Sequence, residues 1–245
     1  MKAIILLAGY ATRMYPLTID KPKALLTVQG KPILDHIIEQ INNLPTVDKI
    51  YAVTNSKFYP HFTQWASTAC TTLPIEVLDD GTSSNDNKLG AIGDIFFTIK
   101  QKSIDDDLLI IAGDNLLKFD LQEQYNFFVH KGNDVLAGKE ITNAKFLKSY
   151  AVANIDKSNK IINFVEKPLT PLPGPGANIG VFAIYFYTAS TAKLFEQYLQ
   201  EGNNPDAPGH FPAWLYKKKD VYIHIIDGDC VDLGSIEMYE QYSNL

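Results

Sequence analysis

Residues 2–26 have the sequence KAIILLAGYATRMYPLTIDKPKALL, which contains the clearest signals for a fold and for a binding site. The apolar run over residues 2–8 predicts a strand that is buried on both faces of a parallel sheet. Gly9 ends this run and opens a polar turn that contains Arg13, the single arginine of the chain. Because ligands of α/β folds bind at the carboxyl ends of parallel strands, this turn is a candidate anion-binding site.

Strand-like and helix-like segments alternate through the first half of the chain. The segment 32–41 has apolar residues at helical spacing, and a second strand is predicted from Ile50. A helix is then predicted from Leu89, followed by a strand that ends at Asn115 and a helix over about 121–131. This order predicts an α/β fold with a Rossmann-like, mainly parallel sheet flanked by helices.

Short strand-like runs joined by turns replace this alternation after about residue 135. These runs predict a β-rich part inserted beside the sheet, and they cover 134–140, 150–156 and 161–168. Later strands and helices are predicted over 180–188, 191–200, 221–227 and 234–245. The Pro- and Gly-rich segment 169–178 predicts a loop that borders a binding site.

Composition and charge exclude several classes of protein. The 245 residues include 46% hydrophobic side chains, enough for a large core, and no apolar run reaches the roughly 18 residues of a membrane span. A net charge of −6 argues against a surface that binds nucleic acid. Cys70 and Cys230 are too few for a disulfide framework or a metal cluster. Two free thiols in a reducing compartment, the cytoplasm, are therefore expected.

Arg13 and Lys23 suggest a phosphate site at the predicted turn. Small residues at positions 8, 9 and 11 allow a phosphate to come close. A guanidinium can donate two hydrogen bonds to phosphate oxygens, and a lysine adds a compact second cation, which suits a triphosphate. A surface arginine with solvated lysines explains the composition equally well. Neither G-x-x-x-x-G-K-[ST] nor G-x-G-x-x-G is present.

Residues 6–26 resemble the signature of the sugar-1-phosphate nucleotidyltransferases, the nucleoside diphosphate sugar pyrophosphorylases that include glucose-1-phosphate thymidylyl- and uridylyltransferases. The usual pattern is L-A-x-G-x-G-T-R-[LM]-x-P-L-T-x-x-x-P-K-x-L-L. Ala11 stands where the family usually has glycine, and its methyl group is tolerated if φ is negative. The resemblance implies that Arg13 and Lys23 act on a nucleoside triphosphate. It also implies that the nucleotide is cradled by Ala8, Gly9, Tyr10, Ala11 and Thr12.

Two aspartates resemble the metal-binding motifs of the same family. Asp114 in IAGDN corresponds to the Gly-Asp-Asn motif, and Asp232 in DCVDLGS corresponds to Asp-x-Gly-[ST]. The resemblance implies that both bind Mg²⁺, which prefers oxygen ligands and bridges phosphates. Taken alone, Asp114 is also a common turn residue, Asp232 an ordinary acid at a strand end and Ser235 a helix N-cap.

A further set of residues resembles the sugar-phosphate site. In EKPLTP, Glu166 corresponds to the residue that binds sugar hydroxyls and Lys167 to the one that binds the acceptor phosphate. A solvated ion pair is the alternative for these two residues in isolation. Other positions that the resemblance places beside the sugar are Asn178, Ile179, Gly180 and Ala151, the last replacing a usual glycine.

The segment 79–94 resembles the loop that recognises the base and the helix that follows it. Asn85 lies five residues before Gly90, where the family often has glutamine, so the resemblance implies that these two residues contact a pyrimidine base. Asn87 is the competing candidate, and Asn85 in a loop without a ligand role is the alternative.

The resemblance implies Mg²⁺-dependent transfer of a nucleotidyl group from a nucleoside triphosphate to a sugar-1-phosphate, with release of pyrophosphate. It implies a single catalytic domain over 1–245, with a nucleotide part over about 1–135 and a sugar-phosphate part, including Asp232, over about 136–245. No general base is needed, and the five histidines are expected to be structural. Bifunctional and allosteric forms, which append further domains, are not expected. Apolar positions within 181–199 are candidates for a homo-oligomer interface.

Three alternatives follow from the same residues. A cytidylyltransferase acting on phosphocholine shares the N-terminal signature, and the 13 Tyr and 13 Phe residues are enough for an aromatic cage. A catalytically silent sensor of nucleotide sugars would be favoured by loss of Arg13, Lys23 or either aspartate, yet all four are present. A nicotinamide-dependent dehydrogenase is disfavoured because the glycine fingerprint is missing.

Overall fold

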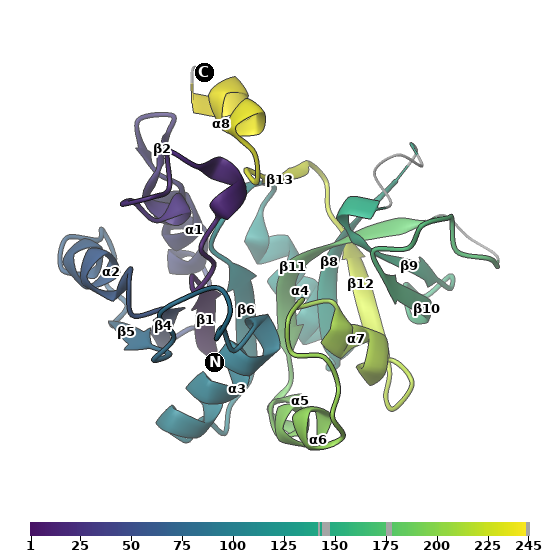
Figure 1. The fold of residues 1–245 in the computed structure, drawn as a ribbon. Coiled ribbons are helices and arrows are strands. Elements are labelled where there is room, and N and C mark those ends of the chain that lie inside the picture. Colours follow the sequence, from purple (N-terminus) through teal and green to yellow (C-terminus); the bar gives the residue numbers. More distant parts are fainter. Residues whose placement is uncertain (142, 144–147, 175–177, 244–245) are drawn as a thin grey trace.

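A computed structural model describes residues 1–141, 143, 148–174 and 178–243. The main sheet has the strand order β10-β9-β11-β6-β1-β4-β5, and β8 pairs with both β11 and β12. Helices cover both faces of this sheet (Figure 1). The α/β fold predicted from the sequence, with a mainly parallel central sheet flanked by helices, is confirmed.

Four parallel strands form one half of the main sheet. They are β1 (Lys2–Leu6), β4 (Lys49–Thr54), β5 (Ile75–Asp79) and β6 (Leu108–Ala112). β1 lies between β4 and β6, and its last residue Leu6 pairs with Val53 and Ala112. The apolar run is fully buried at Ile4 and Ile5, as a central parallel strand requires. The carboxyl ends of these strands therefore lie at one edge of the sheet.

The β-rich part extends the main sheet on the other side of β6. Its strands are β8 (Asp134–Glu140), β9 (Ala151–Ile155), β10 (Ile161–Glu166), β11 (Ile179–Tyr187) and β12 (Val221–Ile225). β11 is antiparallel to β6, β8 and β9 and joins this part to the parallel half. Its register against β8 shifts between Val181, which pairs with Gly138, and Tyr185, which pairs with Leu136. Four steps along β11 thus correspond to two along β8, a bulge-like irregularity that re-aims the side chains of β11.

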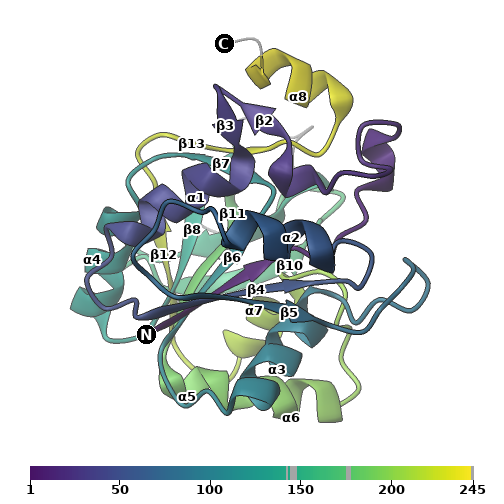
Figure 2. The ribbon, with the colours of Figure 1, turned by 90° about the vertical axis from the view of Figure 1, so that its left-hand side faces the viewer.

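Helices pack on the two faces in separate groups (Figure 2). One face carries α1 (Ile33–Asn42), α2 (Tyr59–Ala66) and α4 (Leu121–Lys131), and the other carries α3 (Ala91–Lys102), α5 (Ala189–Ala192), α6 (Leu194–Gln200) and α7 (His210–Leu215). Ile37 and Phe128 belong to the core of the first face, and Ile95 and Phe211 to that of the second. No helix within the described residues is both long and apolar enough to cross a bilayer.

Several elements differ from those predicted. The helix expected from Leu89 begins at Ala91, because Gly90 has a φ of +81° and lies outside helical geometry. The helix expected over 191–200 is divided into α5 and α6 at Lys193. The expected loop 169–178 is free of regular structure where it is described, and its residues 175–177 lie outside the described residues, as do residues 244–245 of the helix expected over 234–245.

Two small ladders complete the fold. β7 (Asn115–Lys118) pairs with β13 (Asp229–Asp232), which places Asp232 opposite Asn115 and therefore next to Asp114. β2 (Thr27–Val28) pairs with β3 (Lys31–Pro32), and the Tyr239 hydroxyl of α8 (Ile236–Ser243) donates to the Thr27 carbonyl at 3.0 Å. Buried Cys230 and exposed Cys70 are free thiols, as the sequence predicts.

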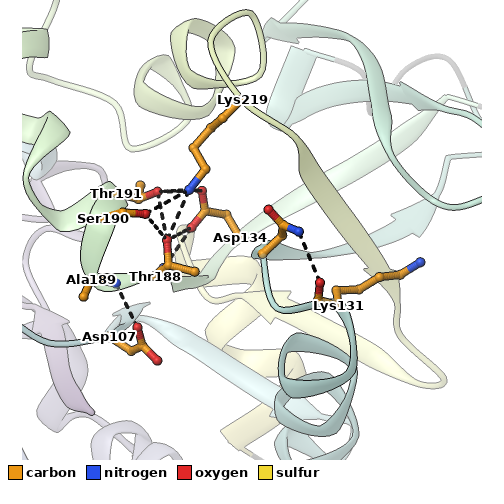
Figure 3. A network of polar contacts seen from close by, with 9 residues as sticks. Asp107, Lys131, Asp134, Thr188, Ala189, Ser190, Thr191 and Lys219 are labelled. Atoms are coloured by element: carbon orange, nitrogen blue, oxygen red, sulfur yellow. Dashed lines mark hydrogen bonds and ion pairs between the residues drawn. The ribbon is translucent and has the colours of Figure 1, made fainter.

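A buried polar network lies at the edge of the main sheet that is opposite to the carboxyl ends of β1, β4, β5 and β6 (Figure 3). Asp134, the first residue of β8, is fully buried and accepts hydrogen bonds from the Thr188 amide at 2.8 Å and the Thr191 hydroxyl at 2.7 Å. Lys219 forms an ion pair with it at 3.0 Å. Because each oxygen of this carboxylate has partners, its burial is compensated. The network ties β8 to α5 and to the segment after α7.

Candidate active site

A cleft of about 540 Å³ lies at the carboxyl edge of the parallel strands. One side, which we name the parallel wall, is formed by residues 6–13, 22–24, 85, 88, 90, 91, 94 and 112–115. The facing side, the antiparallel wall, is formed by residues 149–151, 166–167, 181–183, 185, 206, 208 and 209. The predicted residues that line this cleft are Ala8, Gly9, Tyr10, Ala11, Thr12, Arg13, Lys23, Asn85, Gly90, Asp114, Ala151, Glu166, Lys167 and Asp232.

The turn after β1 presents Arg13 to the cleft. The Ala8 carbonyl accepts from the Asn55 amide at 2.8 Å, and the Ala11 carbonyl accepts from the Thr18 hydroxyl at 2.8 Å, which fixes the turn. Arg13 lies in a short 3₁₀ helix (Thr12–Met14) and is exposed. Within the described part of the chain it forms no hydrogen bond or ion pair, so its guanidinium is free to bind an anion.

The backbone at Ala11 corrects one expectation. Its methyl group was expected to be tolerated through a negative φ, but φ is +47° and ψ is +41°, the left-handed region. Alanine enters this region at a cost, whereas glycine enters it freely. The turn therefore keeps a glycine-type conformation at a position that holds alanine.

Lys23 lies between the two predicted metal ligands. Its ammonium is 2.9 Å from Oδ2 of Asp114 and 3.0 Å from Oδ1 of Asp232, and the residue is 8% exposed. The sequence prediction placed Lys23 on a triphosphate, whereas its partners in the ligand-free structure are these two carboxylates. The ammonium acts as their counter-charge, because two converging carboxylates repel each other without one.

The two carboxylates suit a divalent metal ion. Asp114, between β6 and β7, and Asp232, at the end of β13, reach the same ammonium nitrogen, and about half of each side chain is exposed. Magnesium commonly takes one or two carboxylates and completes its shell with water and phosphate oxygens. Gly234 leaves room beside Asp232, because a Cβ on this glycine would lie 3.0 Å from both carboxylate oxygens. Ser235 accepts from the Met238 amide at 3.2 Å and so caps α8.

Glu166 and Lys167 form the charged part of the antiparallel wall. Burial raises the pKa of Glu166, against the opposing effects of Lys167 and His210. Oε1 of Glu166 is 3.9 Å from the Lys167 ammonium, and the Lys167 side chain is 56% exposed. Lys167 has a φ of +47°. Strained backbone of this kind is found preferentially at functional sites.

Asn178, Ile179 and Gly180 do not line the cleft. Oδ1 of Asn178 accepts from the Leu172 amide at 2.8 Å, and Ile179 is buried at 4% exposure. A Cβ on Gly180 would lie 2.7 Å from the Ile141 side chain, so this glycine is needed for packing. The bulge in β11 instead presents the next residues of the strand to the cleft: Val181, Phe182, Ala183 and Tyr185.

The structure distinguishes the two asparagines of the loop after β5. Asn85 lines the cleft, whereas Oδ1 of Asn87 accepts from the backbone amides of Ser83 and Ser84 at 3.2 and 2.9 Å. Asn87 therefore stabilises its own loop. Of the two, Asn85 remains the candidate for contact with a base.

A loop missed by the sequence prediction connects the two walls. The carbonyls of Pro205 and Asp206 accept from the amides of Ile92 and Ala91, both at 2.9 Å, and cap the N-terminus of α3. Lys88 and Asp206 form an ion pair at 2.7 Å. At the other end of the loop, a Cβ on Gly209 would lie 1.9 Å from Oε2 of Glu166. The segment GNNPDAPGH carries turn signals but no sign of these contacts.

The nucleotidyl transferase family model matches residues 2–245. The chain therefore belongs to the nucleotidyl transferase family, and the family resemblance found in the sequence is confirmed. Bifunctional protein GlmU of Methanocaldococcus jannaschii is 32% identical over 202 residues, which are 80% of this chain and 42% of that protein. A putative mannose-1-phosphate guanyltransferase of Sulfolobus acidocaldarius is 30% identical over 186 residues, 74% of this chain and 48% of that protein. The chain spans less than half the length of these relatives.

Solved structures share the fold over the whole chain. UDP-glucose pyrophosphorylase complexed with UDP-glucose matches with a TM-score of 0.83 at 20% identity, covering 99% of this chain and 97% of that one. A putative glucose-1-phosphate thymidylyltransferase from Bacillus anthracis in complex with a sucrose matches with a TM-score of 0.77 at 19% identity, covering 100% and 94%. At these identities the likeness concerns the fold alone.

Proposed function

We propose that the chain catalyses Mg²⁺-dependent transfer of a nucleotidyl group from a pyrimidine nucleoside triphosphate to a sugar-1-phosphate. The observation that carries this proposal is the meeting of Asp114 and Asp232 around Lys23, in the cleft that Arg13 and Glu166 face from its two walls. Among the relatives, the mannose-1-phosphate guanyltransferase and a glucose-1-phosphate adenylyltransferase of Rhodopirellula baltica are named for transfer to sugar phosphates.

The residues of the parallel wall would bind and orient the triphosphate. Arg13 can donate paired hydrogen bonds to its oxygens, and the amides around Gly9 can approach it closely because no side chain intervenes. A divalent cation held by Asp114 and Asp232 would neutralise charge on the phosphate oxygens. Lys23, which contacts both carboxylates, would share its charge between them and the phosphates.

The antiparallel wall would hold the acceptor. Glu166 can accept hydrogen bonds from sugar hydroxyls, and Lys167 can bind the acceptor phosphate. An oxygen of this phosphate would form a bond to the α-phosphorus while the bond to the bridging oxygen of the leaving pyrophosphate breaks. Because the attacking phosphate oxygen is already ionised, no proton has to be removed and the residues act by positioning and charge stabilisation.

Pyrophosphate release tests the proposal. The assay combines UTP, dTTP, CTP, GTP or ATP with a panel of hexose-1-phosphates and with phosphocholine, in the presence of Mg²⁺. Release with a pyrimidine nucleotide and a sugar-1-phosphate, lost in Asp114→Ala, is the expected result. Release with CTP and phosphocholine alone would support a cytidylyltransferase that acts on phosphocholine. Tyr150 and Phe182 favour this alternative, because their rings pack edge to face at 5.5 Å in the lining of the cleft, as part of an aromatic cage would. Nucleotide binding without release in any combination would contradict catalysis and favour a sensor.

A further inference from the structure

A second pair of acidic side chains, apart from Asp114 and Asp232, joins the parallel wall to the end of β5 behind it. Asp80 follows β5, and Asp94 belongs to the first turn of α3. The two residues are 8% and 4% exposed, and Asp94 lines the cleft beside Gly90 and Ala91. Neither forms an ion pair within the described residues, which sets this pair apart from the carboxylates that hold Lys23.

Hydrogen bonding in this pair requires a proton. Oδ1 of Asp80 accepts from the Thr82 amide and hydroxyl, both at 2.7 Å. Oδ2 of Asp80 and Oδ1 of Asp94 are buried, and no N–H or O–H donor in the described part of the chain reaches them. The two carboxyl groups are within hydrogen-bond reach of each other. Since a carboxylate cannot donate, one of the two must be protonated to form this bond.

Within the described residues, no lysine, arginine or histidine is among the groups that shift the pKa of either carboxyl group. The groups that act on the pair from neighbouring elements are Asp79 at the end of β5 and the Tyr10 hydroxyl after β1, and both are acids. The first two backbone amides of α3, those of Ala91 and Ile92, donate to the loop carbonyls of residues 206 and 205 and not to these carboxyl groups. Burial, and after it the charge of Asp80, raises the pKa of Asp94 to about 8. The geometry and the pKa agree that one proton is held at neutral pH.

We propose that Asp94, through the proton that it shares with Asp80, is a nucleotide-binding determinant of the parallel wall. The cleft binds the anionic nucleotide while the pair carries one negative charge and binds it poorly once the pair carries two. The second charge would appear in a buried wall, where it is weakly screened and repels the phosphates. This inference rests on the proposed function, because it assigns the cleft to a nucleotide.

Calorimetric titration with UTP, dTTP, CTP, GTP and ATP tests the inference, in the presence of Mg²⁺ and without a sugar phosphate. For the nucleotide that binds, the Kd of the wild type should be about tenfold weaker at pH 9 than at pH 7, since loss of the shared proton removes the competent state. Asp94→Asn and Asp80→Asn each replace the proton by an amide donor and should show the same Kd at both pH values. Asp79→Asn, the matched control, removes a neighbouring charge but leaves the shared proton, and its pH dependence should persist.

Each outcome decides the inference. A wild-type Kd that is equal at pH 7 and pH 9 overturns it, as does an unchanged pH dependence in Asp94→Asn. Absence of nucleotide binding at every pH overturns the proposed function and this inference with it. Carboxyl-carbon NMR of the ligand-free protein gives a test that needs no variant: a titration of Asp94 close to pH 8 is expected. A midpoint close to the ordinary aspartate value of about 4 would overturn the shared proton.

Discussion

The two walls of the cleft differ in how the chain builds them. On the parallel wall, the turn that holds Gly9 and Arg13 follows β1, and Asp114 follows β6. On the antiparallel wall, position depends on the bulge in β11, on the end of the edge strand β10 and on the loop that ends at Gly209. Local sequence therefore specifies the first wall, whereas strand pairing and a distant loop specify the second.

The largest effect is expected on the parallel wall. Asp114→Ala removes one of the two carboxylates around Lys23 and should lower kcat/KM for pyrophosphate release at least about 100-fold, because charge stabilisation is the main contribution assigned to this wall. The measurement is steady-state kinetics at saturating Mg²⁺. Asp227→Asn is the control, since Asp227 is exposed and lies outside the cleft. A loss of less than about tenfold in Asp114→Ala would contradict the metal assignment.

The antiparallel wall should be damaged by a single methyl group at Gly209. A Cβ there would lie 1.9 Å from Oε2 of Glu166 and 3.0 Å from the Ala151 Cβ. Gly209→Ala should cost about 1–3 kcal/mol of unfolding free energy through overpacking, and should raise the KM for the sugar phosphate more than that for the nucleotide. Denaturant unfolding and kinetics measure the two effects.

Gly9→Ala is the counterpart of this substitution on the parallel wall. A Cβ on Gly9 meets no atom within 4 Å, so its unfolding free energy should stay within about 0.5 kcal/mol of the wild type. Its methyl group would enter the space assigned to a phosphate and raise the KM for the nucleotide. If Gly9→Ala raised the KM for the sugar phosphate and Gly209→Ala raised that for the nucleotide, the assignment of the two walls would be reversed.

The Asp80–Asp94 pair should give the parallel wall a pH-dependent stability. The pKa of Asp94 is about 8 in the folded protein, whereas in the unfolded chain it is about 4, so between these values the folded state holds more protons. The free energy of unfolding should therefore fall as pH rises, by up to about 1.4 kcal/mol per pH unit, and level off above about pH 8. Urea unfolding at a series of pH values measures this slope. The slope should be shallower in Asp94→Asn, and equal slopes would contradict the raised pKa.

The smallest effect is expected at Ala11. Ala11→Gly relieves a left-handed backbone conformation and should raise the unfolding free energy by about 0.5–1 kcal/mol, after the greater freedom of glycine in the unfolded chain is included. A thermal melt should show an increase of roughly 2 °C. Ala8→Gly is the control, because Ala8 has no positive φ and gains nothing from glycine. Destabilisation by Ala11→Gly would show that the turn does not need this conformation.

The success of sequence-based prediction follows the same division. β1, α1 and α4 have strong hydrophobic periodicity, and they lie within a few residues of where the sequence places them. The sequence did not predict β5, because its five residues are mostly half-buried. It did not predict α2 either, because the two residues that this helix buries, Phe62 and Trp65, are too few to give a clear apolar stripe. The bulge in β11 depends on its pairing with β8, which no local pattern records, so the lining residues after Gly180 could not be predicted. Asp94 was missed because a single aspartate in an apolar helix gives no sign of its partner.

The loop over residues 204–209 connects the two walls and limits the width of the cleft. It grips the N-terminus of α3 at Pro205 and abuts Glu166 at Gly209. Four peptide steps separate these points, so the chain between them can span at most about 14 Å. The length of the loop thus limits how far apart the two walls of the cleft can lie. Adding a residue to it would let the walls move apart, and its length is therefore the property that evolution or design would change to admit a larger acceptor.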